Sequence, residues 1–412
     1  MNSIVLHRIN IDKHKISYDF SFPKELQEYF TGNPFVIKYP QSIENTPKSV
    51  LSIPFVCNVL PIIWLTNTVL EIEELDKAFY ESIFDFKQGY EKMYPNIEFK
   101  GEIRVNKIVN NAFPNTGNTA MFYSGGLDSA FTLVSHLDER PILISIWGSD
   151  VKVDSESEWK LVHSVISDTA KKYDLKEYVI QSAFREFDSE ACLDRDFSQV
   201  LGDGWWHGVK HGIGLLGNAA PLLFQNRISK MYIASSFSPV YGFHKCASDP
   251  SIDNYVRFSS CSIVHDGYGF SRQDKIHQLV LFSKQRHEYF NLHVCWKSHQ
   301  GNNCCQCEKC YRTMCGIWAE GEDPVNYGFF KMPQTIDKSY SFIKRRAESD
   351  YLIPTFYPEI QKTAKKNKKI LKKSKYYKSL KWVITSDFDN LSKNQRNILK
   401  NKFYPLYSLF MK

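Results

Sequence analysis

Six consecutive residues place two glycines among side chains that can meet a phosphate or a metal ion. They are Ser124, Gly125, Gly126, Leu127, Asp128 and Ser129. The apolar run at 119–123 predicts a short buried strand before them, and the run at 130–134 predicts the first turns of a helix after them. A glycine turn at a helix N-terminus points backbone N–H groups and the helix dipole at an anion. The pattern therefore predicts a phosphate cradle.

Asp128 does not suit a simple anion site, because its carboxylate repels phosphate unless a cation lies between them. Mg²⁺ is commonly held by one or two carboxylates together with substrate phosphates. We therefore predict a phosphate-bearing ligand that binds with Mg²⁺. A glycine turn that binds nothing is the alternative, but two serines and an aspartate in this order after a strand favour the phosphate site.

A second group of residues has the spacing of a metal site. Cys295, Cys304, Cys307 and Cys310 follow the pattern C-x8-C-x2-C-x2-C. We expect Cys295 to end a strand at 292–294, Cys304 to lie in a turn, and Cys307 to begin a helix at 308–318. Four thiolates close a tetrahedron around Zn²⁺ with no open position, so the site would be structural.

Other interpretations of the cysteines remain open. Free thiols, a redox dithiol and an iron–sulfur cluster are alternatives, although a redox dithiol needs two cysteines and not four. Cys305 is adjacent to Cys304 and could replace it as the fourth ligand. The clustering itself favours metal over a disulfide framework, because the chain shows no secretory signal.

The hexapeptide at 124–129 has the SGGxDS form and closely resembles the loop of the PP-loop ATP pyrophosphatases. In that family the loop grips the pyrophosphate of ATP, which is cleaved between the α and β phosphates. Together with the cysteine spacing and a basic residue at Arg312, the loop resembles that of zinc-containing 7-cyano-7-deazaguanine synthases. The resemblance covers residues 119–318, and the chain is more similar to larger synthase-like relatives from modification and anti-phage defence gene clusters.

This resemblance implies an enzyme that uses ATP, Mg²⁺ and Zn²⁺. A carboxylate or amide oxygen of a small-molecule or modified-base acid would attack the α-phosphate to give an adenylate and pyrophosphate. Ammonia or an amine would then displace AMP in a ligase-type reaction. Residues 124–129 would bind the nucleotide, with Asp128 and Ser129 also catalytic.

The elements around the loop must bring these residues to one edge of a sheet. Strands are expected at 141–147, 178–182 and 231–235, and helices at 159–172 and about 205–225. This alternation predicts an α/β fold with a doubly wound parallel sheet. Ligands of such sheets lie at the carboxyl ends of the strands, so Trp147, Gly148 and Ser235 join the nucleotide-binding candidates.

Three further side chains are catalytic candidates. His207 and His211 are four residues apart, on one face of a helix, but no third metal ligand is evident. The resemblance assigns Lys210 and His211 to polarising the activated carbonyl or holding phosphate; packing beneath two tryptophans is the alternative. Ser271, Arg272 and Asp274 loosely match a Thr-Lys-x-Glu-like helix start, where Arg272 would stabilise charge on pyrophosphate or the adenylate. An ordinary capped helix fits that segment nearly as well.

Two other functions remain possible from the sequence. Sulfur transfer to tRNA or to a small molecule would use the same adenylation and a persulfide cysteine, for which Cys246 and Cys192 are the candidates. A non-catalytic nucleotide-binding or nucleic-acid-binding component of a defence complex is the other alternative. It would use the basic C-terminal region.

Composition is that of a water-soluble globular protein. Among 412 residues, 43% are hydrophobic and 24% are charged. The most apolar window, at 50–65, is short and interrupted by Pro54 and Pro61, so we expect a core segment and no membrane span. The N-terminus has no signal-peptide pattern, which favours the cytoplasm.

We expect three domains. Residues 1–112 form an N-terminal α+β domain with strands at 5–11, 16–22 and 99–105 and a helix at 70–94, and residues 110–118 are the linker. Residues 113–320 form the ATP pyrophosphatase domain with its zinc motif. Residues 321–412 form a basic, mainly helical domain.

The positive charge of the chain is confined to its C-terminal region. Residues 331–412 hold 20 Lys and Arg against 6 Asp and Glu, a net charge of +14, so the rest of the chain carries −7. Lysines suit a phosphate backbone, and Tyr376, Tyr377 and Trp382 could stack on bases. Nucleic acid is thus a possible partner, as are proteins of the same gene cluster. A solvated helix face or an acidic partner is the more ordinary interpretation.

Overall fold

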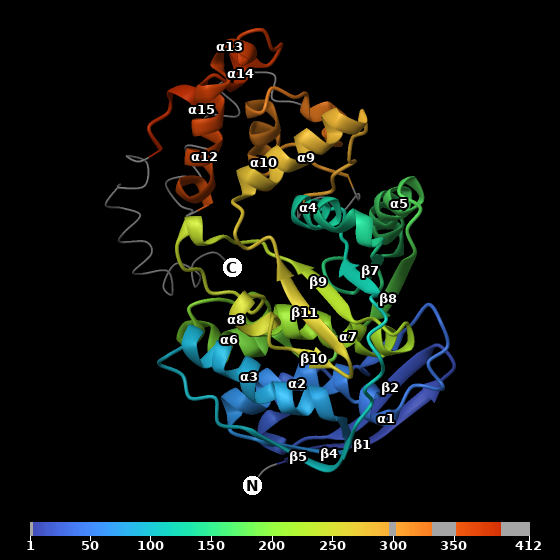
Figure 1. Ribbon diagram of the computed structural model, residues 1–412. Coiled ribbons are helices and arrows are strands. Elements are labelled where there is room, and N and C mark those ends of the chain that lie inside the picture. The colour runs from blue at the N-terminus through green and yellow to red at the C-terminus, as the bar shows by residue number, and fades with distance from the viewer. Residues whose placement is uncertain (1–2, 296–301, 332–351, 389–412) are drawn as a thin grey trace.

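One large sheet organises the protein. The computed structural model describes residues 3–295, 302–331 and 352–388. Its strand order is β10-β11-β9-β6-β7-β8-β3-β2-β1-β4-β5 (Figure 1). The strands are β1 (Ser3–Asp12), β2 (Lys15–Ser21), β3 (Val36–Lys38), β4 (Val69–Asp76), β5 (Glu102–Val109), β6 (Thr119–Phe122), β7 (Ile142–Trp147), β8 (Glu177–Ser182), β9 (Lys230–Ala234), β10 (Arg257–Phe258) and β11 (Cys261–Asp266).

Helices cover both faces of the sheet at its central strands, β6, β7 and β9, and one face at its N-terminal strands β1, β4 and β5 (Figure 1). They are α1 (Lys48–Leu51), α2 (Ile53–Thr66), α3 (Lys77–Met93), α4 (Leu127–His136), α5 (Glu156–Lys172), α6 (Glu190–Leu201), α7 (His211–Gln225), α8 (Pro250–Asp253), α9 (Arg272–Arg286), α10 (Glu308–Ala319), α12 (Leu352–Lys366), α13 (Lys368–Leu371), α14 (Tyr377–Leu380) and α15 (Trp382–Thr385). Short helical turns are η1 (Lys24–Tyr29), η2 (Leu137–Glu139), η3 (Trp206–Lys210), η4 (Pro239–Tyr241) and η5 (Pro324–Tyr327). None of the helices in the described part of the chain combines the length and apolarity that a bilayer span requires.

Five of the strands from β6 onward confirm the expected parallel sheet, whereas β10 pairs antiparallel with β11. β8, β7, β6, β9 and β11 lie side by side and pair in parallel. In chain order these are the third, second, first, fourth and fifth parallel strands, which is the doubly wound order. The order reverses between β6 and β9, so the loop after β6 lies at the switch point where such sheets bind ligands.

Alternate side chains of the central strands enter two different cores. Ala120 packs with α2 and α7 on one face, whereas its neighbour Met121 packs with α4, α9 and α10 on the other. This follows from the period of two in a strand, which turns successive side chains to opposite faces. Both faces are buried, as a parallel sheet requires.

The N-terminal strands extend the same sheet. β3 pairs antiparallel with β8, and β2 and β1 follow, with β4 parallel between β1 and β5. The strands expected at 5–11 and 16–22 are present, and residues 110–118 contain no helix or strand. The sheet therefore continues across the boundary expected at 112.

The prediction of a helix at 70–94 is wrong for its first third. Residues 69–76 form β4, in which Leu70 and Ile72 are buried and Glu71 and Glu73 are more exposed. Parallel pairing on both sides outweighs the helix-like spacing, and α3 begins only after Asp76, whose carboxylate accepts the N–H of Phe79 at 2.9 Å.

Three later segments also differ from expectation. The sequence of residues 264–267 predicts a turn before the helix that begins near Ser271, but residues 264–266 belong to β11, because residues 262–266 pair in parallel with β9. Residues 292–294 form no strand; Leu292 N–H bonds Tyr327 O and His293 N–H bonds Gly125 O. The helix expected from about 205 begins with the π-helical turn η3 before α7.

The spacing of Ile370, Leu371, Tyr376, Tyr377 and Leu380 predicts one apolar face on a single helix, but the lysine-rich segment forms several short helices. Leu371 and Leu380 are buried against the rest of the core, but Ile370 is 60% exposed. Trp382 is buried, and the Tyr376 hydroxyl donates to Asp323 at 3.1 Å. These two rings are therefore engaged within the fold. Residues 389–412 lie outside the described residues.

Gly148, at the end of β7, tests how tightly this edge of the sheet is packed. Its φ is 114°, and a Cβ there would lie 1.9 Å from Ser182 O. We expect Gly148→Ala to lower the free energy of unfolding by about 3 kcal/mol in urea denaturation. Gly32→Ala is the control, because Gly32 also has positive φ but open space, so it should cost only about 1 kcal/mol. Equal costs would contradict the close packing.

Candidate functional site

The loop between β6 and α4 has the form of an anion cradle. Gly125 adopts a φ of 73°, and Gly126 is the N-cap of α4. Ser124 is exposed, whereas Ser129 is buried and its hydroxyl donates to Gly126 O at 3.1 Å. The Ser124 hydroxyl accepts the N–H of Gly126 at 3.3 Å. These bonds hold the turn closed, with the helix N-terminus directed at the space above it.

Asp128 lies in the first turn of α4 and is held by two cations from α9. Its carboxylate pairs with Arg272 Nη1 at 3.0 Å and with Lys275 Nζ at 3.3 Å. Burial alone would raise the pKa of Asp128, but Lys275, Arg272 and Lys309 together hold that pKa below its ordinary value. The carboxylate is therefore ionised at neutral pH.

The surroundings of Asp128 carry more positive than negative charge. Arg272 and Lys275 have side chains only 6% and 2% exposed, and Lys309, which also interacts with Asp150, adds a third cation near Asp128. Arg312 nearby is paired with Glu308. Buried charge without a partner is costly, so an anion at this place would stabilise the cations.

Two polar atoms beside the loop have no hydrogen-bond partner within the described part of the chain. They are Arg272 Nε and His293 Nε2, both buried. His293 lies against Gly125, whose Cβ, if present, would be 3.7 Å from that of His293. Buried polar atoms are rarely left unpaired, so these two point to a missing ligand. The residues present therefore fit a phosphate group.

Sequence reasoning found Asp128 and Arg272 but missed the other polar residues at this place. Lys275 follows Arg272 by one helical turn, and a helical-wheel comparison of the two would have placed both on one face. Lys309 lies between two of the predicted zinc ligands, and the ligand spacing carries no information on the role of the residues in between. No sequence pattern singles out His293.

The nucleotide-binding candidates after β7 and β9 lie at the same edge of the sheet. Trp147 Nε1 donates to Lys152 O at 2.8 Å, and its ring stacks on Trp159. Gly148 has the packing role described above. Ser235 is buried; its hydroxyl donates to Phe237 O, and its carbonyl accepts Lys275 Nζ at 2.5 Å. Lys275 thus connects Ser235 directly to Asp128.

Lys210 and His211 do not share an environment. The Lys210 ammonium is fully buried, 2.5 Å from Asp188 Oδ2, and it donates to Phe184 O at 2.6 Å. Phe184 belongs to the core on the α2 and α7 face of the sheet, whereas the loop packs on the other face. This environment favours a structural role for Lys210. His211 instead lies near Cys246, where burial would raise the pKa of the thiol but His207 and His211 lower it. Cys192 lies on α6.

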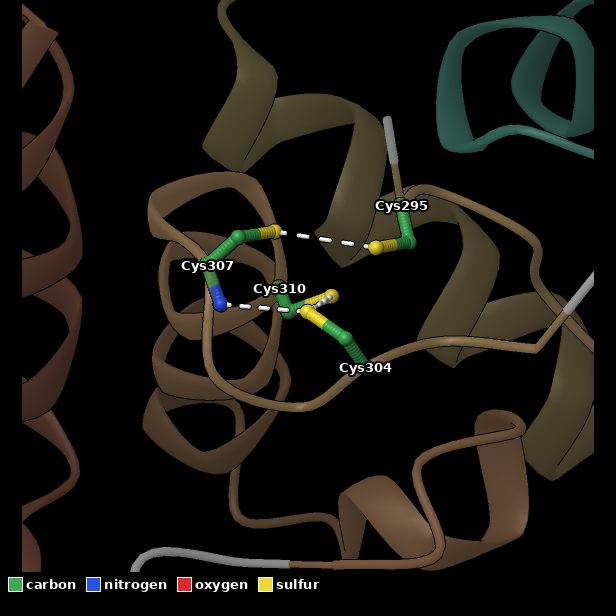
Figure 2. Close-up of side chains that lie close together, drawn as sticks. All are labelled: Cys295, Cys304, Cys307 and Cys310. Carbon is green, nitrogen blue, oxygen red and sulfur yellow. Dashed lines mark hydrogen bonds between the residues drawn. The ribbon is translucent and has the colours of Figure 1, made fainter. Parts of the chain in front are cut away.

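The four predicted zinc ligands come together (Figure 2). Their sulfur atoms lie within 4.8 Å of one another, with 3.8 Å between Cys295 and Cys307 and 3.9 Å between Cys304 and Cys310. A tetrahedron with Zn–S bonds of about 2.3 Å has S–S edges of about 3.8 Å, so the cluster fits Zn²⁺. Cys305 turns its sulfur to Asn303 O at 3.4 Å, which leaves Cys304 as the fourth ligand.

The cysteine cluster is connected to the loop by one backbone hydrogen bond and by hydrogen bonds of the Asn303 and Thr313 side chains. His293, two residues before Cys295, donates its N–H to Gly125 O at 2.8 Å. Asn303 amide groups bond Leu292 O at 2.6 Å and the Val294 N–H at 2.9 Å. On the other side, Thr313 of α10 accepts Arg272 Nη2 at 3.2 Å. A metal at the cysteines would therefore fix the segment at 293–295, which bonds to the loop, and α10, which bonds to Arg272 through Thr313.

The chain matches no protein-family model, no curated protein and no solved structure at a significant level. The geometry of the site thus has to be interpreted on its own chemistry.

The metal centre gives a direct prediction. Purified protein should carry one zinc per chain by elemental analysis, and Cys307→Ser should weaken zinc binding more than about a hundredfold. Cys305→Ser should keep the zinc, because its sulfur lies outside the cluster. Zinc that survives Cys307→Ser, or that is lost with Cys305→Ser, would contradict the ligand set.

The Lys210–Asp188 pair gives a second prediction. Variants of this pair distinguish a structural role of Lys210 from a catalytic role. Lys210→Met alone should lower the free energy of unfolding by about 3–5 kcal/mol, because Asp188 stays buried and unpaired. Lys210→Met with Asp188→Leu should recover most of that loss. The double variant should bind a non-hydrolysable ATP analogue as the wild type does. A tenfold weaker affinity in that stable double variant would restore the catalytic assignment.

Proposed function

We propose that the protein binds ATP with Mg²⁺ on residues 124–129 and forms AMP and pyrophosphate while activating a carboxylate or amide oxygen. The observation that carries this proposal is the cluster of Asp128, Arg272 and Lys275 at the N-terminus of α4. It combines a metal-binding carboxylate with excess positive charge at the switch point of a doubly wound sheet.

The described residues supply three kinds of contact for a pyrophosphate group. Backbone N–H groups of the glycine turn and the first turn of α4 face the anion. Arg272 offers its unpaired Nε, and Lys275 and Lys309 add charge nearby. Such preorganised donors stabilise the charge that develops on a leaving pyrophosphate. Bound Mg²⁺ would neutralise phosphate oxygens beside Asp128.

In the absence of a ligand Asp128 pairs with Arg272 and Lys275. We propose that these ion pairs are replaced when ATP and Mg²⁺ bind. The depressed pKa of Asp128 keeps it anionic and available to a cation. When Asp128 faces a metal ion, the two basic side chains become free to pair with phosphate oxygens. Catalysis would then consist mainly of positioning and charge neutralisation.

The acceptor is proposed from the sequence resemblance alone. The loop and the cysteine motif are similar to those of 7-cyano-7-deazaguanine synthases, so a 7-deazapurine carboxylic acid is the first substrate class to test. A nitrogen nucleophile would complete the reaction as a C–N ligation. The cysteine-bound zinc would brace the loop from behind, through His293 and Gly125, and would take no part in the chemistry.

The products identify the reaction. With ATP, Mg²⁺, a panel of 7-deazapurine and other carboxylic acids, and hydroxylamine as a trapping amine, the wild type should form AMP, pyrophosphate and a hydroxamate. Asp128→Asn should lower AMP formation by at least about a hundredfold, because the carboxylate that faces the metal is neutralised. Mass spectrometry of all three products measures this.

The matched control is Asp138→Asn, an exposed acid of η2 on the same connection after α4. It should keep the wild-type rate within about twofold, because a surface carboxylate contributes little. Release of ADP and phosphate in place of AMP and pyrophosphate would contradict the proposed reaction. So would a fully active Asp128→Asn variant.

A further inference from the structure

The C-terminal helices carry a surface of a single charge. Residues 362–381 include ten lysines and no acidic residue, and all ten lysine side chains are exposed. These ten lysines are termed the basic surface. Within the part of the chain that the structure describes, Lys375 alone among them forms an ion pair, with Asp323 at 2.8 Å. The other nine charges face solvent and together create a strong positive potential.

Helix α12 turns its lysines away from the core. Its buried stripe recurs every three or four residues, at Ile353, Tyr357, Ile360 and Ala364. Lys362 and Lys366 are four residues apart and fall on the opposite side of a helix that turns by about 100° per residue. Burial of the stripe thus fixes the direction in which these two side chains leave the helix.

The short helices that follow are held by the core and by α10. Leu371 is buried in the core that α10 also enters. Asn367 Nδ2 donates to Ala319 O at 2.8 Å, and Trp318 Nε1 donates to the Ser374 hydroxyl at 3.2 Å. The lysines are therefore displayed on an ordered support, so little backbone entropy is lost when a partner binds.

The basic surface lacks the apolar contacts that other kinds of partner require. Ile370 is the one large hydrophobic side chain of residues 352–388 that is exposed. A protein interface depends on a few large anchors such as aromatic rings, and a membrane-surface helix inserts a wide apolar face. A chain of phosphates, in contrast, is bound by lysines alone. The chemistry therefore favours a nucleic acid backbone.

The aromatic rings of this region are not available to stack on bases. Trp382 is buried, and Tyr376 donates its hydroxyl to Asp323 at 3.1 Å while Lys375 Nζ lies 4.9 Å from the centre of its ring. Tyr377 is half-buried. Proteins that hold single strands stack successive bases on aromatic rings. A duplex, whose bases are already stacked on one another, fits this surface better.

We propose that the basic surface binds the phosphate backbone of a double-stranded nucleic acid without reading its sequence. The ammonium groups neutralise phosphates, and the counterions released from the duplex drive the association. This interaction goes beyond the proposed function and does not depend on it, since the ten lysines lie outside the residues that form the nucleotide site.

Helix α12 places this partner beside the nucleotide site and not within it. Phe356, near the start of α12, packs edge-on against Tyr241, with 4.7 Å between ring centroids. The Tyr241 hydroxyl in turn accepts the N–H of Arg272 at 2.6 Å. Lys366 is the last residue of α12, about 15 Å further along the helix axis. The duplex and the nucleotide therefore occupy different places.

The test uses the full-length, zinc-loaded protein and fluorescence anisotropy. The probes are labelled duplexes of about 24 base pairs, one of DNA and one of RNA, titrated from about 50 to 200 mM salt. The wild type should bind with a slope of log K against log salt of about −3.5 or steeper, which corresponds to four or more neutralised phosphates. The tighter of the two duplexes identifies the source of the phosphates.

The triple variant Lys362→Gln, Lys366→Gln, Lys369→Gln assigns the binding to this surface. The three side chains are exposed, so the variant should unfold at the same urea concentration as the wild type. It should weaken duplex binding by at least about tenfold and flatten the salt slope by roughly three, one for each lysine.

The matched control is Lys15→Gln, Lys24→Gln, Lys38→Gln, which removes three exposed lysines from β2, η1 and β3. It should bind the duplex within about twofold of the wild type, because these lysines lie outside the basic surface.

Several results would overturn the proposal. One is duplex binding that is absent, that survives the triple variant, or that falls equally in the control. Another is tighter binding to a single strand, to vesicles containing phosphatidylserine or to polyglutamate, since each represents a different class of partner. Displacement of the duplex by a non-hydrolysable ATP analogue would place it in the nucleotide site instead.

Discussion

The structure around the switch point depends on the charge balance at Asp128. The Asp128 carboxylate, at the N-terminus of α4, faces Arg272 and Lys275, which are almost fully buried, and Lys309, which also interacts with Asp150. This pairing joins α4 to the start of α9, and Lys275 extends it to the end of β9 through Ser235 O. Because the positive charges exceed the negative ones, the same residues that hold the helices together also prepare a place for an anion.

The cysteine cluster supports this arrangement from the side. Cys295 and its preceding residues reach the glycine turn through His293, and α10, which begins after Cys307, reaches Arg272 through Thr313. A metal ion bound by the four thiolates would hold the segment before Cys295 and helix α10 together. We therefore interpret the metal centre as a structural brace for the loop, which explains why a closed four-cysteine site lies so near a site of different chemistry.

Local patterns gave the parts of the site that depend on neighbours in the sequence. The hexapeptide, the cysteine spacing and the capped helix at Ser271 are each contained in a few residues, and the structure contains the turn, the cluster and the capping box. The alternation of strands and helices likewise predicted the parallel sheet.

Features that depend on tertiary contacts were missed. β4 was mistaken for helix, because its leucine and isoleucine spacing runs on into α3 and only pairing with β1 and β5 selects the strand. Lys275 and Lys309 meet Asp128 across more than 140 positions, and the segment at Cys246 and Ala247 meets His207 although α7 and β9 lie between them in the chain. Lys210, assigned by resemblance, is engaged by Asp188, which no local pattern indicates.

The most direct test of the central claim is a crystal structure with α,β-methylene-ATP and Mg²⁺. The account predicts the β- and γ-phosphates on the N–H groups of the glycine turn, with Arg272 Nε on a phosphate oxygen and the metal ion beside Asp128. A nucleotide bound elsewhere, with Asp128 still paired to Arg272 and Lys275, would contradict it.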